Sequence, residues 1–172
     1  MRILLDVALI VVLLVGLYLL VSIFWPLLIG GAGYTPTPIF STRKAMEIAN
    51  VGPNDTLYDL GCGMGSVLSE AKKRGAAVVG VEIEPLRWLV CRLRVRNAKV
   101  ILGNMFKVPL QDATVVFLFQ YPNVNRKLRT KLERELRPGT RVVSYVWKIE
   151  GWTPAKTFGE LYLYTVGKSI KT

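Results

Sequence analysis

The segment that most constrains the fold is a short apolar run that leads into a turn with a glycine at every second position. Residues 57–60 are typical of a buried β-strand, and Gly61, Gly63 and Gly65 follow it. Glycines let the backbone turn tightly and approach a ligand where a side chain would collide. Residues 66–74 then predict a helix whose first N–H groups point at the same place. The segment therefore predicts a strand, a turn and a helix that together cradle a nucleotide-like ligand.

The spacing of the glycines and an acidic residue ahead of them narrow the choice of ligand. A dinucleotide-binding turn has its third glycine where this chain has Ser66, and the Gly-Lys-Ser/Thr ending of a phosphate-binding P-loop is absent. Asp59 lies just ahead of the turn, where a carboxylate would repel a pyrophosphate and attract an ammonium group. A cofactor with a cationic amino-acid end fits this pattern, and we expect S-adenosylmethionine.

A second strand ends in a second acidic residue. Residues 76–81 are apolar or glycine, and Glu82 follows them. In folds of this kind, an acid at the tip of the next strand, roughly 20 residues on, holds the ribose hydroxyls of a bound nucleotide. We therefore expect Glu82 to bind the ribose of the cofactor.

Composition excludes several kinds of chemistry. The chain has 172 residues, enough for one domain, and no histidine, which excludes a histidine base and a histidine-ligated metal site. Its two cysteines, Cys62 and Cys91, cannot build a zinc site alone, so we expect no metal. Their placement indicates reduced thiols in a compartment that faces the cytosol. The net charge of +11 favours anionic surroundings such as a membrane surface or nucleic acid.

The N-terminus predicts a membrane anchor. Residues 7–29 carry no charge, and as a helix they are about 35 Å long, enough to cross a hydrocarbon core of about 30 Å. A cleaved signal peptide is the alternative, but its apolar core is usually about 7–15 residues long. We expect one transmembrane helix over 3–29. Arg43 and Lys44 follow it, which favours a single-pass protein with its C-terminal domain on the cytoplasmic side.

The rest of the chain alternates between helical and extended patterns, which predicts a doubly wound, mostly parallel α/β sheet. Residues 30–40 are expected to form a linker that covers the cofactor, and 41–172 the globular domain. The first helix is expected to begin at Ser41, and the helix after Glu82 to turn Leu89 inward and Arg87 outward. The expected helices are 41–50, 66–74, 85–97 and 122–136, and the expected strands are 57–60, 76–82, 100–102, 113–119, 140–147 and 161–166.

Several motifs resemble those of class I, or seven-β-strand, S-adenosylmethionine-dependent methyltransferases, whose fold is a compact Rossmann-like sheet. Within this class, the chain is similar to the small archaeal protein-lysine methyltransferases. It also resembles their membrane-anchored mitochondrial relatives, which methylate lysines of the ATP synthase c-subunit and the adenine nucleotide translocator. The similarity covers residues 34–167, and the segments that carry it are 34–38, 58–63, 80–83, 103–106, 113–116, 123–125, 136–144, 151–152 and 163–164.

The resemblance implies a role for particular residues. Asp59 would orient the methionine part of the cofactor, Glu82 would hold the ribose, and the glycine turn would pass under the cofactor. Ile83 would pack on the adenine, and Thr37 would close over the cofactor. The implied cofactor-binding residues are Thr37, Asp59, Gly61, Cys62, Gly63, Gly65, Glu82, Ile83, Asn104 and Met105, and the residues expected to border the catalytic channel are Gln120, Tyr121 and Asn123.

The resemblance implies a membrane-anchored methyltransferase that acts on lysine side chains of proteins at or in the membrane. Three alternatives remain: a methyltransferase of lipid headgroup amines, one of nucleic acids, and a module that binds the cofactor without catalysis. Nucleic-acid amine methyltransferases carry Asp or Asn, then Pro-Pro and an aromatic residue after the fourth strand. Residues 120–123 of this chain read Gln-Tyr-Pro-Asn, which makes nucleic acid the less favoured substrate.

Overall fold

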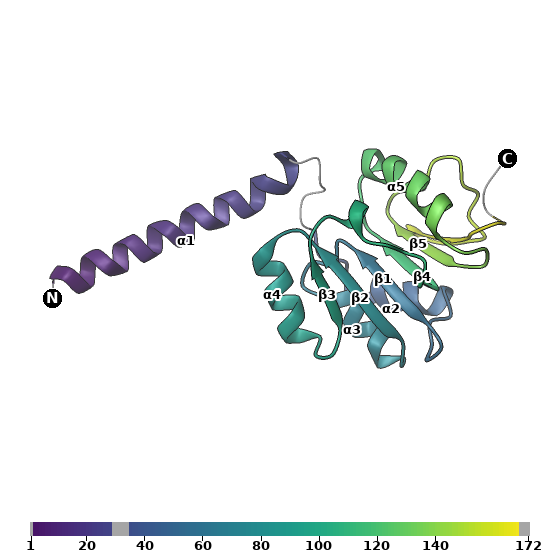
Figure 1. Cartoon of the computed structure of the whole chain (residues 1–172), viewed down its shortest axis with the longest axis horizontal. Helices are drawn as coiled ribbons and strands as arrows, with labels where there is room; N and C mark the ends of the chain where they lie inside the picture. Colours follow the sequence, from purple (N-terminus) through teal and green to yellow (C-terminus); the bar gives the residue numbers. More distant parts are fainter. Residues whose placement is uncertain (1, 29–34, 169–172) are drawn as a thin grey trace. The chain divides into compact units, whose positions relative to one another are not determined.

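The computed structural model describes residues 2–28 and 35–168, in two units (Figure 1). The first unit, Met1–Tyr34, contains one helix, α1 (Arg2–Leu28). The second, Thr35–Thr172, is a compact α/β unit. Residues 29–34, which include much of the predicted linker and the end of the predicted anchor, lie outside the described residues.

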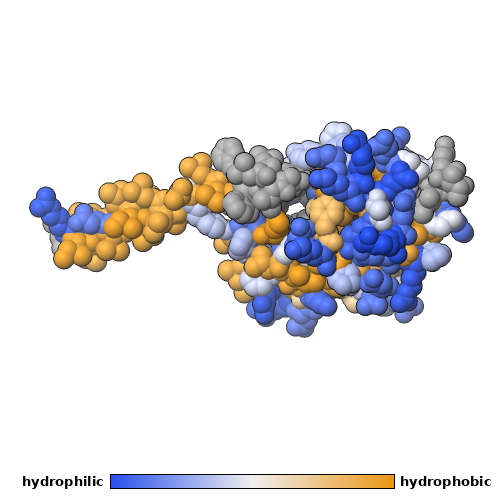
Figure 2. All heavy atoms as spheres, turned by 45° about the horizontal axis from the view of Figure 1, so that its top comes forward, coloured by the Kyte–Doolittle hydropathy of each residue, from blue (hydrophilic) through white to orange (hydrophobic). Residues whose placement is uncertain are grey.

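α1 is the long apolar helix that the uncharged N-terminal run predicts. Its stretch Arg2–Val21 has a mean hydropathy of 2.9, and none of it is buried. Hydrophobic atoms cover most of its surface in Figure 2. Among the described residues, this is the one helix that is long and apolar enough to cross a membrane.

The compact unit is built on a seven-stranded sheet with the strand order β3-β2-β1-β4-β5-β7-β6. The strands β1 to β5 pair in parallel, whereas β7 is antiparallel to both β5 and β6. The predicted doubly wound, mostly parallel sheet is therefore confirmed. The strands are β1 (Thr56–Leu60), β2 (Ala77–Glu82), β3 (Lys99–Leu102), β4 (Val115–Leu118), β5 (Arg141–Tyr145), β6 (Lys156–Phe158) and β7 (Leu161–Thr165).

Helices cover both faces of this sheet (Figure 1). Three of them pack on one face: α2 (Ile39–Ile48), α3 (Ser66–Lys73) and α4 (Pro85–Arg94). α5 (Pro122–Glu135) packs on the other face, and the short 3-10 helix η1 (Met105–Lys107) follows β3. Successive side chains of a strand point to opposite faces. Phe117 accordingly joins the core under α2 to α4, and the next residue of β4, Leu118, joins the core under α5.

Two elements differ from the sequence-based expectation. α2 begins at Ile39, directly after Pro38, so Ser41 lies inside its first turn and is not the residue before the helix. Pro38 precedes the helix with an extended ψ of 143°, and its carbonyl accepts the first helical hydrogen bond, from the N–H of Thr42 at 2.9 Å. β6 was not expected: it pairs with β7 through a two-residue turn at Gly159, whose φ is +53°.

The orientation of α4 also differs from the expectation. Arg87 is buried and Leu89 is 43% exposed, so the inward and outward assignments of these two residues were wrong. Cys91 and Val95 face the core as expected. Arg87 is buried because two carboxylates lie beside it, a pairing that a count of apolar residues does not reveal.

A polar cluster holds the amino ends of three strands together. Asp55, just ahead of β1, accepts a hydrogen bond from the Thr114 hydroxyl at 2.7 Å and is also paired with the guanidinium of Arg141. Arg141 also donates to the backbone carbonyls of Ala49 and Asn50. We call Asp55, Thr114 and Arg141 the amino-edge cluster. It joins β1, β4 and β5 at the edge of the sheet opposite the glycine turn.

Candidate functional site

The strands β1 to β5 are parallel, so their carboxyl ends meet at one edge of the sheet, which we call the carboxyl edge. β1 lies between β2 and β4. After β1 the chain adds β2 and β3 on one side of it, and then crosses over to add β4 and β5 on the other side. Ligands of open α/β sheets bind where the strand order reverses in this way. The residues after β1, β2 and β4 are therefore the first candidates for a site.

The glycine turn after β1 has the conformation that its spacing predicts. The backbone φ is +108° at Gly61, +52° at Gly63 and +81° at Gly65, values that other residues rarely adopt. The N–H groups of Gly61 and Cys62 both donate to the carbonyl of Val81, at 2.9 Å each. The turn is thus fixed to the end of β2, and α3 starts directly after Gly65.

We expect Gly61→Ala to weaken both folding and cofactor binding. An alanine at this position would have to adopt the φ of +108°, which is strained for residues with a side chain. Its Cβ would also overlap Nε2 of Gln120. Backbone strain of this kind costs about 1–3 kcal/mol. Thermal unfolding and calorimetric titration with the cofactor measure the two effects. Gly52→Ala is the matched control, because its added Cβ meets no heavy atom within 4 Å. Equal behaviour of the two variants would contradict the expectation.

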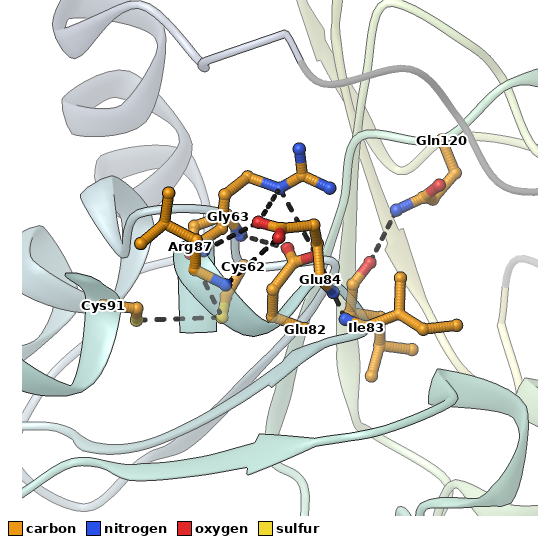
Figure 3. A network of polar contacts seen from close by, with 10 residues as sticks. Cys62, Gly63, Glu82, Ile83, Glu84, Arg87, Cys91 and Gln120 are labelled. Carbon is orange, nitrogen blue, oxygen red and sulfur yellow. Dashed lines mark hydrogen bonds and ion pairs between the residues drawn. The ribbon is translucent and has the colours of Figure 1, made fainter. Parts of the chain in front are cut away.

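Glu82 lies at the centre of a buried polar network at the end of β2 (Figure 3). Its Oε2 accepts a hydrogen bond from the N–H of Gly63 at 2.9 Å. Its Oε1 accepts from the N–H groups of Ile83 and Glu84, at 3.0 and 2.9 Å. Nε of Arg87 lies 3.5 Å from Oε1 of Glu82 and 3.8 Å from Oε2 of Glu84. These contacts hold the Glu82 carboxylate in one place beside the glycine turn.

Glu84 and Arg87 are functional-site neighbours that sequence reasoning missed. Glu84 caps α4, because its carboxylate accepts hydrogen bonds from the N–H groups of Leu86 and Arg87, at 3.1 and 2.8 Å. A proline is common at the first position of a helix, so the residue before it is the candidate cap. That signal could have identified Glu84. Glu82 and Glu84 are both buried, and a nearby cation such as Arg87 stabilises two buried carboxylates.

Asp59 has a different environment from Glu82. Its side chain is only 4% exposed, and no hydrogen bond or ion pair to its carboxyl group is present among the described residues. Burial raises the pKa of Asp59 well above its usual range, and the nearby Cys91 and Glu82 add to the effect. A buried carboxyl group without a partner is costly as an anion. Asp59 is therefore a place where a cationic ligand group would be favourable.

This arrangement fits S-adenosylmethionine. The cofactor carries an α-ammonium group, for which the unpartnered Asp59 carboxyl is suited, and a ribose, whose hydroxyls suit the fixed carboxylate of Glu82. Both acids come from the ends of neighbouring strands, with the glycine turn between them. When bound, the cofactor supplies a methyl group already activated by its sulfonium centre.

The other predicted cofactor-binding residues differ in burial. Thr37, Ile83 and Met105 are half-buried, and Met105 packs against the core under α5. Asn104 is exposed, and its side chain starts η1 by accepting a hydrogen bond from the N–H of Phe106 at 2.9 Å. Cys62 is buried.

Cys62 and Cys91 form a pair of free thiols beside the glycine turn. Their sulfur atoms lie 3.8 Å apart, on the turn and on α4. The contact with Cys91, together with burial, raises the pKa of the Cys62 thiol. An added Cβ at Gly65 would overlap the Cys91 sulfur, so this glycine also leaves room for the packing of α4.

The three predicted catalytic residues after β4 have different positions. Gln120 is buried, and its side chain amide donates to the carbonyl of Leu60 at 2.7 Å, which places it against the glycine turn (Figure 3). Tyr121 is 42% exposed. Asn123 is exposed in the first turn of α5, where its oxygen accepts a hydrogen bond from the adjacent Val124 N–H.

A strained turn after β5 brings a further aromatic residue to this edge, which sequence reasoning did not identify. The N–H of Trp147 donates to the carbonyl of Tyr145 at 2.8 Å, and φ of the intervening Val146 is +66°. This is the rare γ-turn with a positive φ at its centre, and it is unusual for a β-branched residue. The ring of Trp147 lies 6.4 Å from that of Tyr121. Such strain is concentrated at functional sites in proteins.

Side chains under the turn hold it in place. The carbonyl of Trp147 accepts hydrogen bonds from the Ser144 hydroxyl and from the amide of Asn125, which is 1% exposed. The same amide donates to the Ser144 hydroxyl at 3.4 Å. Asn125 and Ser144 thus connect α5 to the end of β5 and hold the backbone carbonyl of Trp147 in place.

The sequence is similar to those of known methyltransferases. A family model described as the ANTKMT methyltransferase domain matches residues 59–156. The chain is 40% identical over 151 residues to a protein-lysine N-methyltransferase of Saccharolobus islandicus, and the match covers 78% of this chain and 94% of that protein. It is 34% identical to a human lysine N-methyltransferase named for the ATP synthase c-subunit, with 61% and 48% of the two chains covered.

A solved structure has the same fold. The crystal structure of an RNA methyltransferase from Salinibacter ruber, in complex with S-adenosyl-L-homocysteine, matches with a TM-score of 0.76 and 34% identity. The match covers 80% of this chain and 97% of that one. The chain therefore belongs to the ANTKMT methyltransferase family and is an S-adenosylmethionine-dependent methyltransferase.

Proposed function

We propose that the protein is a protein-lysine N-methyltransferase that α1 anchors in a membrane, with the compact unit on the cytoplasmic side. Its substrates in this proposal are lysines of proteins at or in that membrane. The observation that carries the proposal is the 40% identity to the archaeal protein-lysine N-methyltransferase, along 94% of that protein. The human relative is named for a lysine of the ATP synthase c-subunit, but this chain covers only 48% of it.

The main task of the protein in this reaction is to align the lysine amine with the methyl group of the cofactor. A neutral lysine amine attacks the methyl carbon, the carbon–sulfur bond breaks toward the sulfonium sulfur, and the extra proton on nitrogen leaves to water. Alignment of reactants supplies much of the rate in such displacements. A desolvated channel lowers the pKa of the incoming lysine and so increases the fraction that can react. Asp59 and Glu82 would hold the cofactor in line.

The lysine in this proposal enters between the ends of β4 and β5. Gln120 borders the glycine turn, and Tyr121 and Trp147 present partly exposed rings side by side. Aromatic faces attract ammonium groups, and their apolar surface suits the lysine methylene chain. The strained Val146 turn aims Trp147 at this entry, which supports a role beyond packing.

We expect Trp147→Ala to raise KM for the protein substrate and to leave cofactor affinity unchanged. Loss of one cation–π contact costs about 0.5–2 kcal/mol, which corresponds to roughly a 2- to 30-fold increase. Trp147→Phe keeps an aromatic face, so its KM for the protein substrate should lie between those of the wild type and Trp147→Ala. Steady-state kinetics at saturating cofactor separate KM from kcat. A fall in cofactor affinity would instead indicate that the whole carboxyl edge has shifted.

An RNA substrate is the second candidate, because the solved structure with 34% identity is titled an RNA methyltransferase and the chain has a net charge of +11. Arginines and lysines supply most of the binding energy for nucleic acids. Much of the positive charge on α5 is paired, however: Arg129 with Glu133, Lys131 with Glu135 and Arg126 with Glu150. The lysine proposal therefore remains the better supported.

Transfer of a labelled methyl group tests the proposal. The full-length protein and its Asp59→Ala and Glu82→Ala variants are added to membranes with the radiolabelled cofactor, and protein, lipid and RNA fractions are counted. We expect label in protein, dependent on both acids, and methyllysine in the labelled bands by mass spectrometry. Label found only in RNA or only in lipid would overturn the lysine assignment. Cofactor binding without label in any fraction would indicate a binding module.

A further inference from the structure

The outer face of α4 is apolar. Leu86, Leu89 and Leu93 recur at helical spacing, so they share one face of the helix, and they are 43%, 43% and 69% exposed. The opposite face, with Cys91 and Val95, is buried in the core. In Figure 2, hydrophobic atoms lie on the side of the compact unit where Figure 1 places α4. We call Leu86, Leu89 and Leu93 the leucine stripe.

Positive charges flank the leucine stripe. Residues 85–102, which contain α4 and β3, include no Asp or Glu. Arg92, Arg94, Arg96 and Lys99 are all exposed. Arg92 lies 5.3 Å over the ring of the half-buried Trp88, so its charge stays beside the stripe. An apolar stripe with arginines on both sides and no acid is the pattern of a helix that lies in the surface of an anionic membrane.

From this pattern we propose that the leucine stripe of α4 docks on an anionic phospholipid bilayer, as a second membrane contact besides α1. This inference deepens the membrane part of the proposed function and rests on it. The chemistry of the surface favours lipid over a nucleic acid or a second copy of this chain. A nucleic acid stacks on aromatic rings, whereas the stripe is aliphatic. A second copy of this chain would have to place the four exposed cations against the same cations.

The docking would orient the site. α4 follows directly after Glu82 and Glu84, and its first residues lie beside the carboxyl edge. A stripe that rests on the bilayer would therefore hold the carboxyl edge close to the membrane surface. Lysines of membrane proteins near the headgroups would then be within reach of the site.

A fluorescent probe on the stripe tests this directly. Leu93→Cys in the full-length chain is labelled with an environment-sensitive dye, and Lys127→Cys on α5 is the matched control, because both positions are exposed. The two native cysteines are buried and do not compete for the dye. The proteins are reconstituted into vesicles of phosphatidylcholine alone or with phosphatidylglycerol. We expect a blue shift at position 93 with the anionic vesicles, a smaller shift with neutral ones, and none at position 127.

A second variant tests the role of charge. Arg92→Glu with Arg94→Glu should abolish the difference between anionic and neutral vesicles, and methyl transfer provides a check that the protein is folded. Equal emission at positions 93 and 127 in a chain that floats with the vesicles would overturn the docking and leave the anchor intact. A chain that does not float with vesicles would overturn both. A shift at position 93 that grows with protein concentration in detergent would identify a second copy as the occupant and overturn the lipid.

Discussion

Asp59→Asn is expected to abolish methyl transfer at ordinary cofactor concentrations while it stabilises the protein that has no cofactor bound. The asparagine keeps the shape of the side chain but removes the anion that would meet the cofactor ammonium. Loss of one partner of a buried charge pair costs about 2–5 kcal/mol, which is at least a roughly 30-fold loss of affinity. Without cofactor, the same change removes a buried carboxyl group that has no hydrogen bond or ion pair among residues 2–28 and 35–168.

The stabilisation should depend on pH in a defined direction. Burial raises the pKa of Asp59 in the folded protein well above the value of about 3.9 in an unfolded chain. Between these two values the folded state binds more protons than the unfolded state, so the free energy of unfolding falls as the pH rises. Asn does not titrate. The advantage of Asp59→Asn over the wild type should therefore be small near pH 4 and grow as the pH rises.

Two measurements on the full-length protein in detergent check this prediction. Thermal unfolding without cofactor, from about pH 4 to pH 8, compares the variant with the wild type, and calorimetry gives the affinity for the cofactor. Addition of saturating cofactor should reverse the order of stability, because the wild type alone binds it tightly. A wild type that is the more stable protein at neutral pH without cofactor would contradict the assignment of Asp59 as an unpartnered acid.

Glu82→Ala is expected to have the opposite effect on stability. The change removes the acceptor of three backbone N–H groups and one of the two carboxylates beside the buried Arg87. Removing a partner from a buried ion pair costs about 3–5 kcal/mol. The melting temperature should fall by roughly 10 °C or more. The glycine turn would lose its contact at Gly63, so cofactor affinity should fall as well.

The control for Glu82→Ala is an acid in an exposed ion pair. Glu150 pairs with Arg126 at 3.1 Å, and both side chains are largely exposed. Such pairs contribute at most about 1 kcal/mol, so Glu150→Ala should leave the melting temperature nearly unchanged. Thermal unfolding of the two variants side by side measures the contrast. A small effect of Glu82→Ala would show that the network in Figure 3 does not hold the turn.

The sequence alone predicted the architecture because its signals are local. The parallel strands consist mostly of apolar residues, and the turn after β1 requires glycines at fixed positions. The same reasoning assigned Asp59 to the methionine part of the cofactor and Glu82 to the ribose, but it did not predict that their surroundings differ. Their surroundings differ because Glu82 accepts hydrogen bonds from three backbone N–H groups and lies beside Arg87 of α4, contacts that depend on the folded turn and helix. Their roles toward the cofactor remain predictions.

Other features could not be predicted because they depend on contacts across the fold. A positive φ at Val146 contradicts the preference of a β-branched residue, and it is held by Ser144 and by Asn125 from another element. The exposed leucines of α4 were partly misassigned, since an apolar residue is expected to face the core. β6 does have a local signal, because a glycine at the first position of a two-residue turn, such as Gly159, is typical of a β-hairpin.

The amino-edge cluster bears on how this family diversifies. Asp55, Thr114 and Arg141 connect three strands at the edge away from the site, so these polar contacts do not involve the loops that would meet a substrate. Substitutions in the loops after β4 and β5 can then accumulate in evolution without unfolding the domain. A relative named for a protein lysine matches this chain in sequence, and a solved structure titled for RNA shares its fold. The contribution of these three residues to stability would be kept while those two loops change, whereas Glu82 could not change without loss of stability.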